Sequence, residues 1–96
     1  MLANQKKIHF IGIGGIGMSG MAELLNNLGH IITGSDLSDS DRIQHLKEIG
    51  LDISIGHNNN NINNHDLVVF SSAVNIENPE IIESKRQNIP VIKRAE

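Results

Sequence analysis

The chain has 96 residues, a formal net charge of −3 at pH 7, no cysteine, and two phenylalanines as its only aromatic residues. Without cysteine, disulfides, thiolate catalysis and cysteine-based zinc sites are excluded. No basic cluster is present to bind a nucleic-acid backbone, and no Trp or Tyr offers a base-stacking platform. No apolar run approaches the roughly 20 residues that cross a bilayer, and we find no signal peptide. We therefore expect one small cytoplasmic domain that partners neither nucleic acid nor membrane.

Apolar runs alternate with helix-period stretches from the first residues onward. The run at 7–12 predicts a strand buried on both faces, and 30–34 predicts a second one. Between them, a helix is expected over 17–28, with Gly29 as its C-terminal cap. The apolar stripe that this helix is expected to bury comprises Met21, Leu24, Leu25 and Leu28.

The same alternation continues through the middle of the chain. A second helix is expected over 41–49, with its N-cap among the polar residues just before it. Its inward residues are expected to be Ile43, Leu46 and Ile49, and a short strand follows at 52–55. The Asn-rich segment 58–64 is interpreted as a loop with one helical turn and no function of its own.

The last third predicts a strand at 66–71, a helix from Asn78-Pro79 to about Gln87, and a strand from Pro90. This helix is expected to bury Ile81 and Ile82. Strands that alternate with helices give an α/β fold, here a Rossmann-like open parallel sheet of about five strands with helices on both faces. The chain ends without a closing element, so we expect it to be part of a longer protein.

A glycine-rich segment after the first strand carries the strongest indication of a ligand. Gly12, Gly14 and Gly17 match G-x-G-x-x-G, which permits a tight turn, a close approach of diphosphate to the backbone, and close packing of helix on strand. The amide groups of 15–19 are then expected to point at the diphosphate, helped by the helix dipole. The alternative is a turn that only packs a helix on a sheet, and Gly20 fits that alternative.

Polar residues at later strand ends are the next candidates. Asp36 lies 22 residues after Gly14, where an acid accepts hydrogen bonds from a ribose or a base; it could instead cap the following turn. Ser71 to Val74 close the fourth strand, where ligands of open α/β sheets bind, although a simple polar strand end fits as well. Ser35 is interpreted as a turn residue.

The five histidines show no metal-ligand spacing, so we expect no metal site. His9 is interpreted as a packed, hydrogen-bonded residue rather than a catalyst, and His57 as a residue within possible reach of the ligand. No G-x-x-x-x-G-K-[ST] occurs, so the chain has no P-loop for ATP, and we assign no catalytic residue.

Several segments together closely resemble the N-terminal domain of the Mur ligases of peptidoglycan synthesis, and in particular the members that join L-alanine to UDP-N-acetylmuramic acid. The resemblance covers nearly the whole chain and is far more specific than G-x-G-x-x-G alone. The matching segments are HFIGIGGIGMSGMA from His9, Gly34-Ser35-Asp36, Ser71-Ser72-Ala73-Val74, Asn78-Pro79-Glu80 and PVIKRAE from Pro90.

The resemblance implies that residues 1–96 are the UDP-binding first domain of a three-domain, ATP- and Mg²⁺-dependent ligase of the cytoplasm. The ATP, magnesium and amino-acid sites would lie in the central and C-terminal domains, so this chain alone is expected to bind UDP-N-acetylmuramic acid through its UDP part and to be inactive. The residues that the resemblance assigns to UDP are Gly14, Gly15, Ile16, Gly17, Met18, Ser19, Asp36, Ser71, Ser72 and Ala73.

Two other functions stay open from the residues alone. An NAD-binding Rossmann domain of an oxidoreductase would explain the three glycines and Asp36, although a dinucleotide site uses two mononucleotide halves and this chain supplies little more than one and a half. A nucleotide-sensing module without catalytic activity is the other. The substitution Gly14→Val is expected to block the diphosphate while leaving the fold largely intact.

Overall fold

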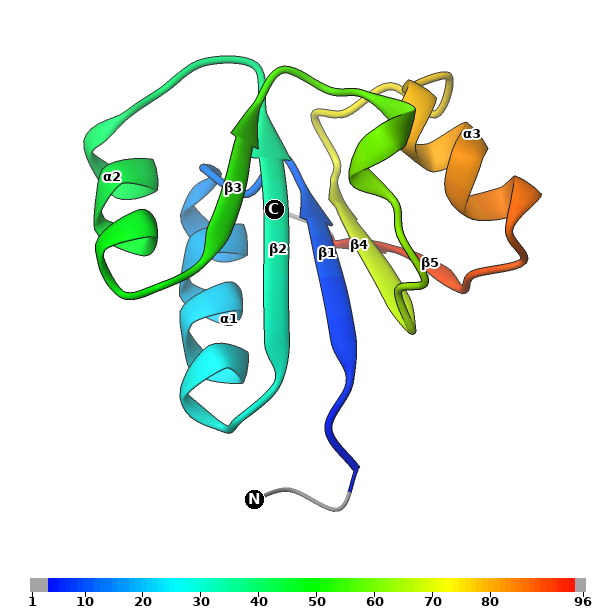
Figure 1. Cartoon of the computed structure of the whole chain (residues 1–96). Helices are drawn as coiled ribbons and strands as arrows, with labels where there is room; N and C mark the ends of the chain where they lie inside the picture. Colours follow the sequence, from blue (N-terminus) through cyan, green and yellow to red (C-terminus); the bar gives the residue numbers. More distant parts are fainter. Residues whose placement is uncertain (1–3, 95–96) are drawn as a thin grey trace.

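A computed structural model describes residues 4–94, which form one parallel β-sheet with helices on both faces (Figure 1). All the strands pair in parallel, in the order β3-β2-β1-β4-β5. The strands are β1 (Lys7–Ile11), β2 (Ile31–Asp36), β3 (Asp52–Ile55), β4 (Leu67–Ser71) and β5 (Val91–Arg94). The helices are α1 (Ile16–Asn27), α2 (Asp41–Glu48) and α3 (Pro79–Arg86), with a 3-10 turn, η1 (Asn59–Asn61). The predicted fold class and the predicted strands are confirmed.

The strand order reverses between β1 and β4. The chain runs outward from β1 to β3 and then returns to β4 on the other side of β1. Helices α1 and α2 cover one face of the sheet, while α3 and η1 cover the other (Figure 1). In open parallel sheets this reversal leaves a crevice at the carboxyl ends of the two central strands, which is where ligands bind.

The sheet separates two hydrophobic clusters. Phe10 belongs to the larger cluster under α1 and α2, and Ile11, the next residue of β1, belongs to the smaller cluster under α3. Both side chains are fully buried. Because successive side chains of a strand point to opposite faces, β1 must be apolar throughout, which explains its continuous apolar run.

The inward face of α1 differs from the predicted stripe. Met18 and Ala22 are fully buried, whereas Leu24 and Leu28 are 57% and 53% exposed. Met21 and Leu25 pack only at the edge of the core. Met18 and Ala22, four residues apart, define the inward face, and Leu24 and Leu28 lie to one side of it, toward solvent.

Two further apolar residues were predicted to be inside and lie outside. Ile49 is 37% exposed at the end of α2, and Ile82 is 56% exposed on α3. On α3 the inward positions are taken by Glu80, Ile81 and Ser84, all of them buried. A pattern of apolar residues cannot identify this face, because a hydrogen-bonded carboxylate occupies part of it.

Gly34 leaves room for the core side chain of Ile13. A Cβ placed at Gly34 would lie 3.0 Å from the Ile13 Cβ and still closer to its Cδ1, and Ile13 is fully buried. We expect Gly34→Ala to destabilise the chain by about 1 to 3 kcal/mol through overpacking. Gly20→Ala is the matched control, since a Cβ there meets nothing within 4 Å, and it is expected to stabilise α1 by about 0.5 to 1 kcal/mol. Urea unfolding of the two variants measures both effects; equal stabilities would contradict the packing argument.

Candidate functional site

The glycine-rich loop is tied to β2 by its own backbone. The amide groups of Gly12 and Ile13 both donate to the Ser35 carbonyl oxygen, at 2.9 and 3.1 Å. Gly12 has a φ of +81°, in the left-handed region that favours glycine. Gly15 N–H donates back to the Gly12 carbonyl at 3.1 Å, which closes the turn. The loop is therefore held in place before any ligand arrives.

Three amide groups at the start of α1 remain unpaired. The N-cap, Gly15, has no side chain to accept from them, and the first helical hydrogen bond is donated by Ser19 to the Gly15 carbonyl at 2.9 Å. No residue within 4–94 accepts from the amides of Ile16, Gly17 and Met18. Of the five amides expected at the diphosphate, those of Gly15 and Ser19 are used within the protein. The remaining three present partial positive charge at the helix terminus.

A guanidinium group lies against Gly17, in the first turn of α1. A Cβ built on Gly17 would be 3.0 Å from Arg94 Nε and 3.1 Å from Nη2. Arg94 Nε is buried, and no described residue accepts a hydrogen bond from it. The space that Gly17 leaves is filled by the side chain of Arg94, the last residue of β5, so Gly17 lets α1 pack closely against the end of a strand. Arg94 was not among the predicted site residues, although its place at the carboxyl end of β5 could have pointed to it.

A cavity of about 600 Å³ opens at the carboxyl ends of the strands. Of the ten predicted site residues, Gly14, Gly15, Asp36, Ser71 and Ala73 line it. The other five do not: Ile16, Gly17, Met18, Ser19 and Ser72. His57 also lines the cavity, as do residues of the 37–43 and 74–78 segments.

Asp36 caps the backbone on both sides of the cavity edge, as the alternative interpretation expected, and it also lines the cavity. Its Oδ2 accepts from Gly14 N–H at 2.8 Å, and its Oδ1 accepts from Leu37 N–H at 2.8 Å. The carboxylate therefore caps the local backbone while it lines the cavity. Each oxygen keeps a second acceptor site for a ligand hydroxyl or N–H.

The space beside Gly14 is occupied by the protein itself. A Cβ at Gly14 would lie 2.9 Å from Asp36 Oδ2 and 3.2 Å from Ile43 Cδ1. Gly14→Val would therefore disturb the contacts of α2 and Asp36, contrary to the expectation that it leaves the fold largely intact. Substitutions outside the loop test ligand binding more cleanly.

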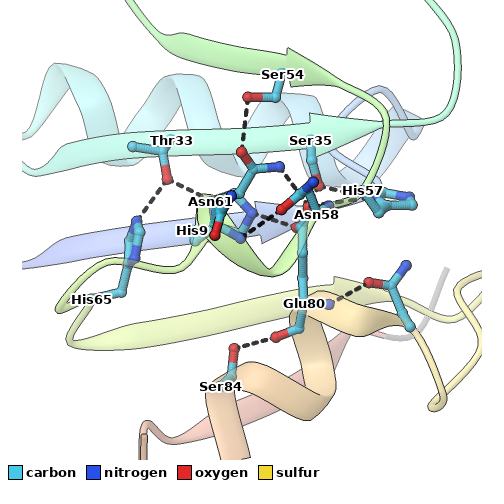
Figure 2. Close-up of polar contacts among 12 residues, drawn as sticks. His9, Thr33, Ser35, Ser54, His57, Asn58, Asn61, His65, Glu80 and Ser84 are labelled. Carbon is cyan, nitrogen blue, oxygen red and sulfur yellow. Dashed lines mark hydrogen bonds and ion pairs between the residues drawn. The ribbon is translucent and has the colours of Figure 1, made fainter.

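Behind the cavity, the carboxylate of Glu80 is fully buried and surrounded by donors (Figure 2). Its Oε1 lies 2.7 Å from His9 Nε2 and 2.6 Å from Ser35 Oγ. Its Oε2 accepts from Asn58 N–H at 2.9 Å and from Asn61 Nδ2 at 2.7 Å. His9 is thus the packed, hydrogen-bonded residue that was predicted. Ser35 was predicted to be a turn residue, but it is a buried residue of β2. Its hydroxyl donates a hydrogen bond to Glu80.

These contacts shift two pKa values. Burial alone raises the pKa of the Glu80 carboxyl, but the hydrogen bonds from His9, Ser35 and Asn61 outweigh it and lower the pKa from 4.5 to about 2. Burial, together with His9 and Lys7, lowers the pKa of His65 from 6.5 to about 4. His65 Nε2 lies 2.8 Å from Thr33 Oγ1, which in turn lies 2.6 Å from His9 Nδ1. At neutral pH this buried chain therefore ends on an ionised Glu80.

The shift at His65 makes stability sensitive to acid. Between pH 6.5 and 4 the unfolded chain binds a proton at this residue that the folded chain does not, so the free energy of unfolding falls as the pH falls. We expect His65 to contribute a loss of about 2 kcal/mol between pH 7.5 and pH 5. Urea unfolding at both pH values measures it. His65→Asn is expected to be less stable at pH 7.5 but to lose less on acidification, and an unchanged loss would exclude His65 as the cause.

Within residues 4–94 no three His, Cys, Asp or Glu side chains are grouped to hold a metal ion. No helix in this range is long and apolar enough to span a membrane.

Comparison with known proteins gives one family. Residues 7–96 match the Mur ligase family, catalytic domain. A UDP-N-acetylmuramate–L-alanine ligase of Trichlorobacter lovleyi is 55% identical over 96 residues, which are 100% of this chain and 21% of that protein.

Two solved structures share the fold and part of the sequence. The crystal structure of a UDP-N-acetylmuramate-alanine ligase of Thermotoga maritima matches with a TM-score of 0.91 at 37% identity, covering 94% of this chain and 21% of that one. A murein peptide ligase of Psychrobacter arcticus matches with a TM-score of 0.80 at 29% identity, covering 90% of this chain and 18% of that one. This chain spans about a fifth of the length of these proteins.

Proposed function

The chain belongs to the Mur ligase family, and we propose that it is the UDP-binding N-terminal domain of a UDP-N-acetylmuramate–L-alanine ligase. Two relatives with that name match the whole chain, at 55% and 54% identity. The domain, residues 1–96, would bind the UDP part of UDP-N-acetylmuramic acid in the cavity at the carboxyl ends of β1 and β4.

One observation carries the proposal: three unpaired amides of α1 follow directly on the glycine loop that lines the cavity, and the guanidinium of Arg94 lies against Gly17 in the same turn. A helix N-terminus binds phosphate oxygens through its amides, and a guanidinium adds charge-assisted hydrogen bonds. With the diphosphate bound at the N-terminus of α1, Asp36 would contact the uridine. The Ser71–Ala73 segment would contact the phosphates or the sugar.

The whole protein would add L-alanine to UDP-N-acetylmuramic acid at the expense of ATP, in the cytoplasm, as a step of peptidoglycan synthesis. Neither ATP nor Mg²⁺ fits the residues of this chain, which contains no P-loop and, in its described part, no acidic or histidine group that could hold a metal. The contribution of this chain is to bind and orient the nucleotide, and by itself it is expected to be inactive.

Binding of UDP distinguishes this function from an NAD-dependent oxidoreductase. Calorimetric titration of the chain is expected to show binding of UDP-N-acetylmuramic acid and of UDP, and none of NADH. The physical reason is that the chain holds one cradle for a nucleotide diphosphate and not the second half that a dinucleotide requires. Tight NADH binding without UDP binding would overturn the proposal.

Arg94 tests the position of the diphosphate. We expect Arg94→Ala to weaken UDP binding about tenfold, because a charge-assisted hydrogen bond to a phosphate is lost. Arg86→Ala is the matched control, since Arg86 is exposed on α3 and pairs with Glu83; it is expected to change the affinity less than about twofold. Equal effects of the two substitutions would indicate non-specific attraction by charge and not a site at α1.

A further inference from the structure

We propose that His57 recognises the base of the bound nucleotide as a hydrogen-bond acceptor, and that Ser35 and Glu80 fix the tautomer this requires. The inference deepens the proposed function, on which it rests, because it concerns the choice of uridine over cytidine within the same cavity.

The direction of each hydrogen bond follows from Glu80. An ionised carboxylate only accepts, so Ser35 Oγ, 2.6 Å from Oε1, must donate its single proton to it. His57 Nδ1 lies 2.8 Å from the same Ser35 Oγ. Since the hydroxyl has no second proton to give, the Nδ1 must carry a hydrogen and donate it to Ser35 (Figure 2). The Glu80 carboxylate, 3.6 Å from His57 Nδ1, favours the same arrangement.

The other ring nitrogen of His57 is left for a ligand. With Nδ1 protonated, a neutral imidazole has a lone pair on Nε2. No described residue donates to Nε2, and it is not among the buried polar atoms without a partner, so this atom is accessible, on a residue that lines the cavity. The residues that line the cavity thus include a fixed acceptor on His57 as well as the carboxylate of Asp36.

A fixed acceptor distinguishes the two pyrimidines. The N3 position of uracil carries a hydrogen and donates, whereas the N3 position of cytosine is a lone pair and would face the lone pair of Nε2. A site that hydrogen-bonds a ligand N–H rejects the analogue that lacks it, since the partner in the site stays unpaired. The ribose hydroxyls do not compete for His57, because Asp36 can accept from them.

The same reasoning assigns the opposite tautomer to the other two buried histidines. His65 Nδ1 accepts from Asn63 N–H at 3.0 Å, so its hydrogen lies on Nε2 and is donated to Thr33. Thr33 then donates to His9 Nδ1, and His9 donates from Nε2 to Glu80. Three histidines of one network therefore divide into one Nδ1–H ring and two Nε2–H rings.

The tautomers can be measured without any ligand. Long-range ¹H–¹⁵N NMR spectra of the histidine rings at pH 8 are expected to show His57 as the Nδ1–H form and both His9 and His65 as the Nε2–H form. Assignment by single His→Gln variants identifies each ring. A His57 ring in the Nε2–H form would overturn the inference, whatever the chain binds.

Base selectivity is tested with UDP and CDP, which share the ribose and the diphosphate. We expect the chain to bind UDP about tenfold more tightly than CDP at pH 8. In His57→Ala this ratio is expected to fall below about twofold while CDP binding changes little. Ser35→Ala, which removes the acceptor for Nδ1–H, is expected to lower the ratio as well, since Ser35 acts as a positioning residue.

His45→Ala is the matched control, because His45 is an exposed histidine that contacts only Glu23 among the described side chains; it is expected to keep the ratio. Circular dichroism shows whether each variant folds. Equal binding of UDP and CDP, or a ratio unchanged in His57→Ala, would refute the role of His57 and leave UDP binding intact. Absence of binding to either nucleotide would instead refute the proposed function.

Discussion

The structure depends on one buried negative charge, the carboxylate of Glu80. Taking an ion out of water costs several kcal/mol unless its acceptor sites are filled. Here β1, β2 and the η1 loop each supply donors, so both oxygens accept twice. Because those donors come from three separate elements, the charge fixes how α3 sits against the sheet. It also orders the hydrogens of every histidine that it contacts, directly or through a hydroxyl.

Two sets of polar groups near the carboxyl ends of the strands thereby serve different purposes. Beneath the cavity, the acid and its donors form a rigid polar layer that has no unsatisfied side-chain group. Next to the glycine loop, the first three amides of α1 and the buried Nε of Arg94 lack partners among the described residues. A ligand with phosphate oxygens would complete this second set without disturbing the first. With this separation, a ligand would meet a pre-formed surface, which would limit the ordering cost of binding.

The strands were predictable from the sequence because isoleucine-rich runs between glycines are typical of parallel strands buried on both faces. The glycine loop was predictable because its spacing follows from local backbone geometry. The inward faces of α1 and α3 were not, since Ala22 and Glu80 are inward for reasons that involve distant residues. The donors of Glu80 lie 71, 45, 22 and 19 positions away, and no local pattern encodes such partnerships.

The asparagines around η1 have different structural roles, although they are the same residue type. The side chain of Asn61 reaches the buried acid, and Asn64 holds a φ of +58° that few other residues tolerate. The side chain of Asn59, by contrast, makes no hydrogen bond with any described residue, so this position does not require an amide. Insertions or deletions here would shift the register of the loop and withdraw the Asn58 and Asn61 donors together. The length of this low-complexity segment is therefore fixed by the structure, whereas the residue type matters at only a few of its positions.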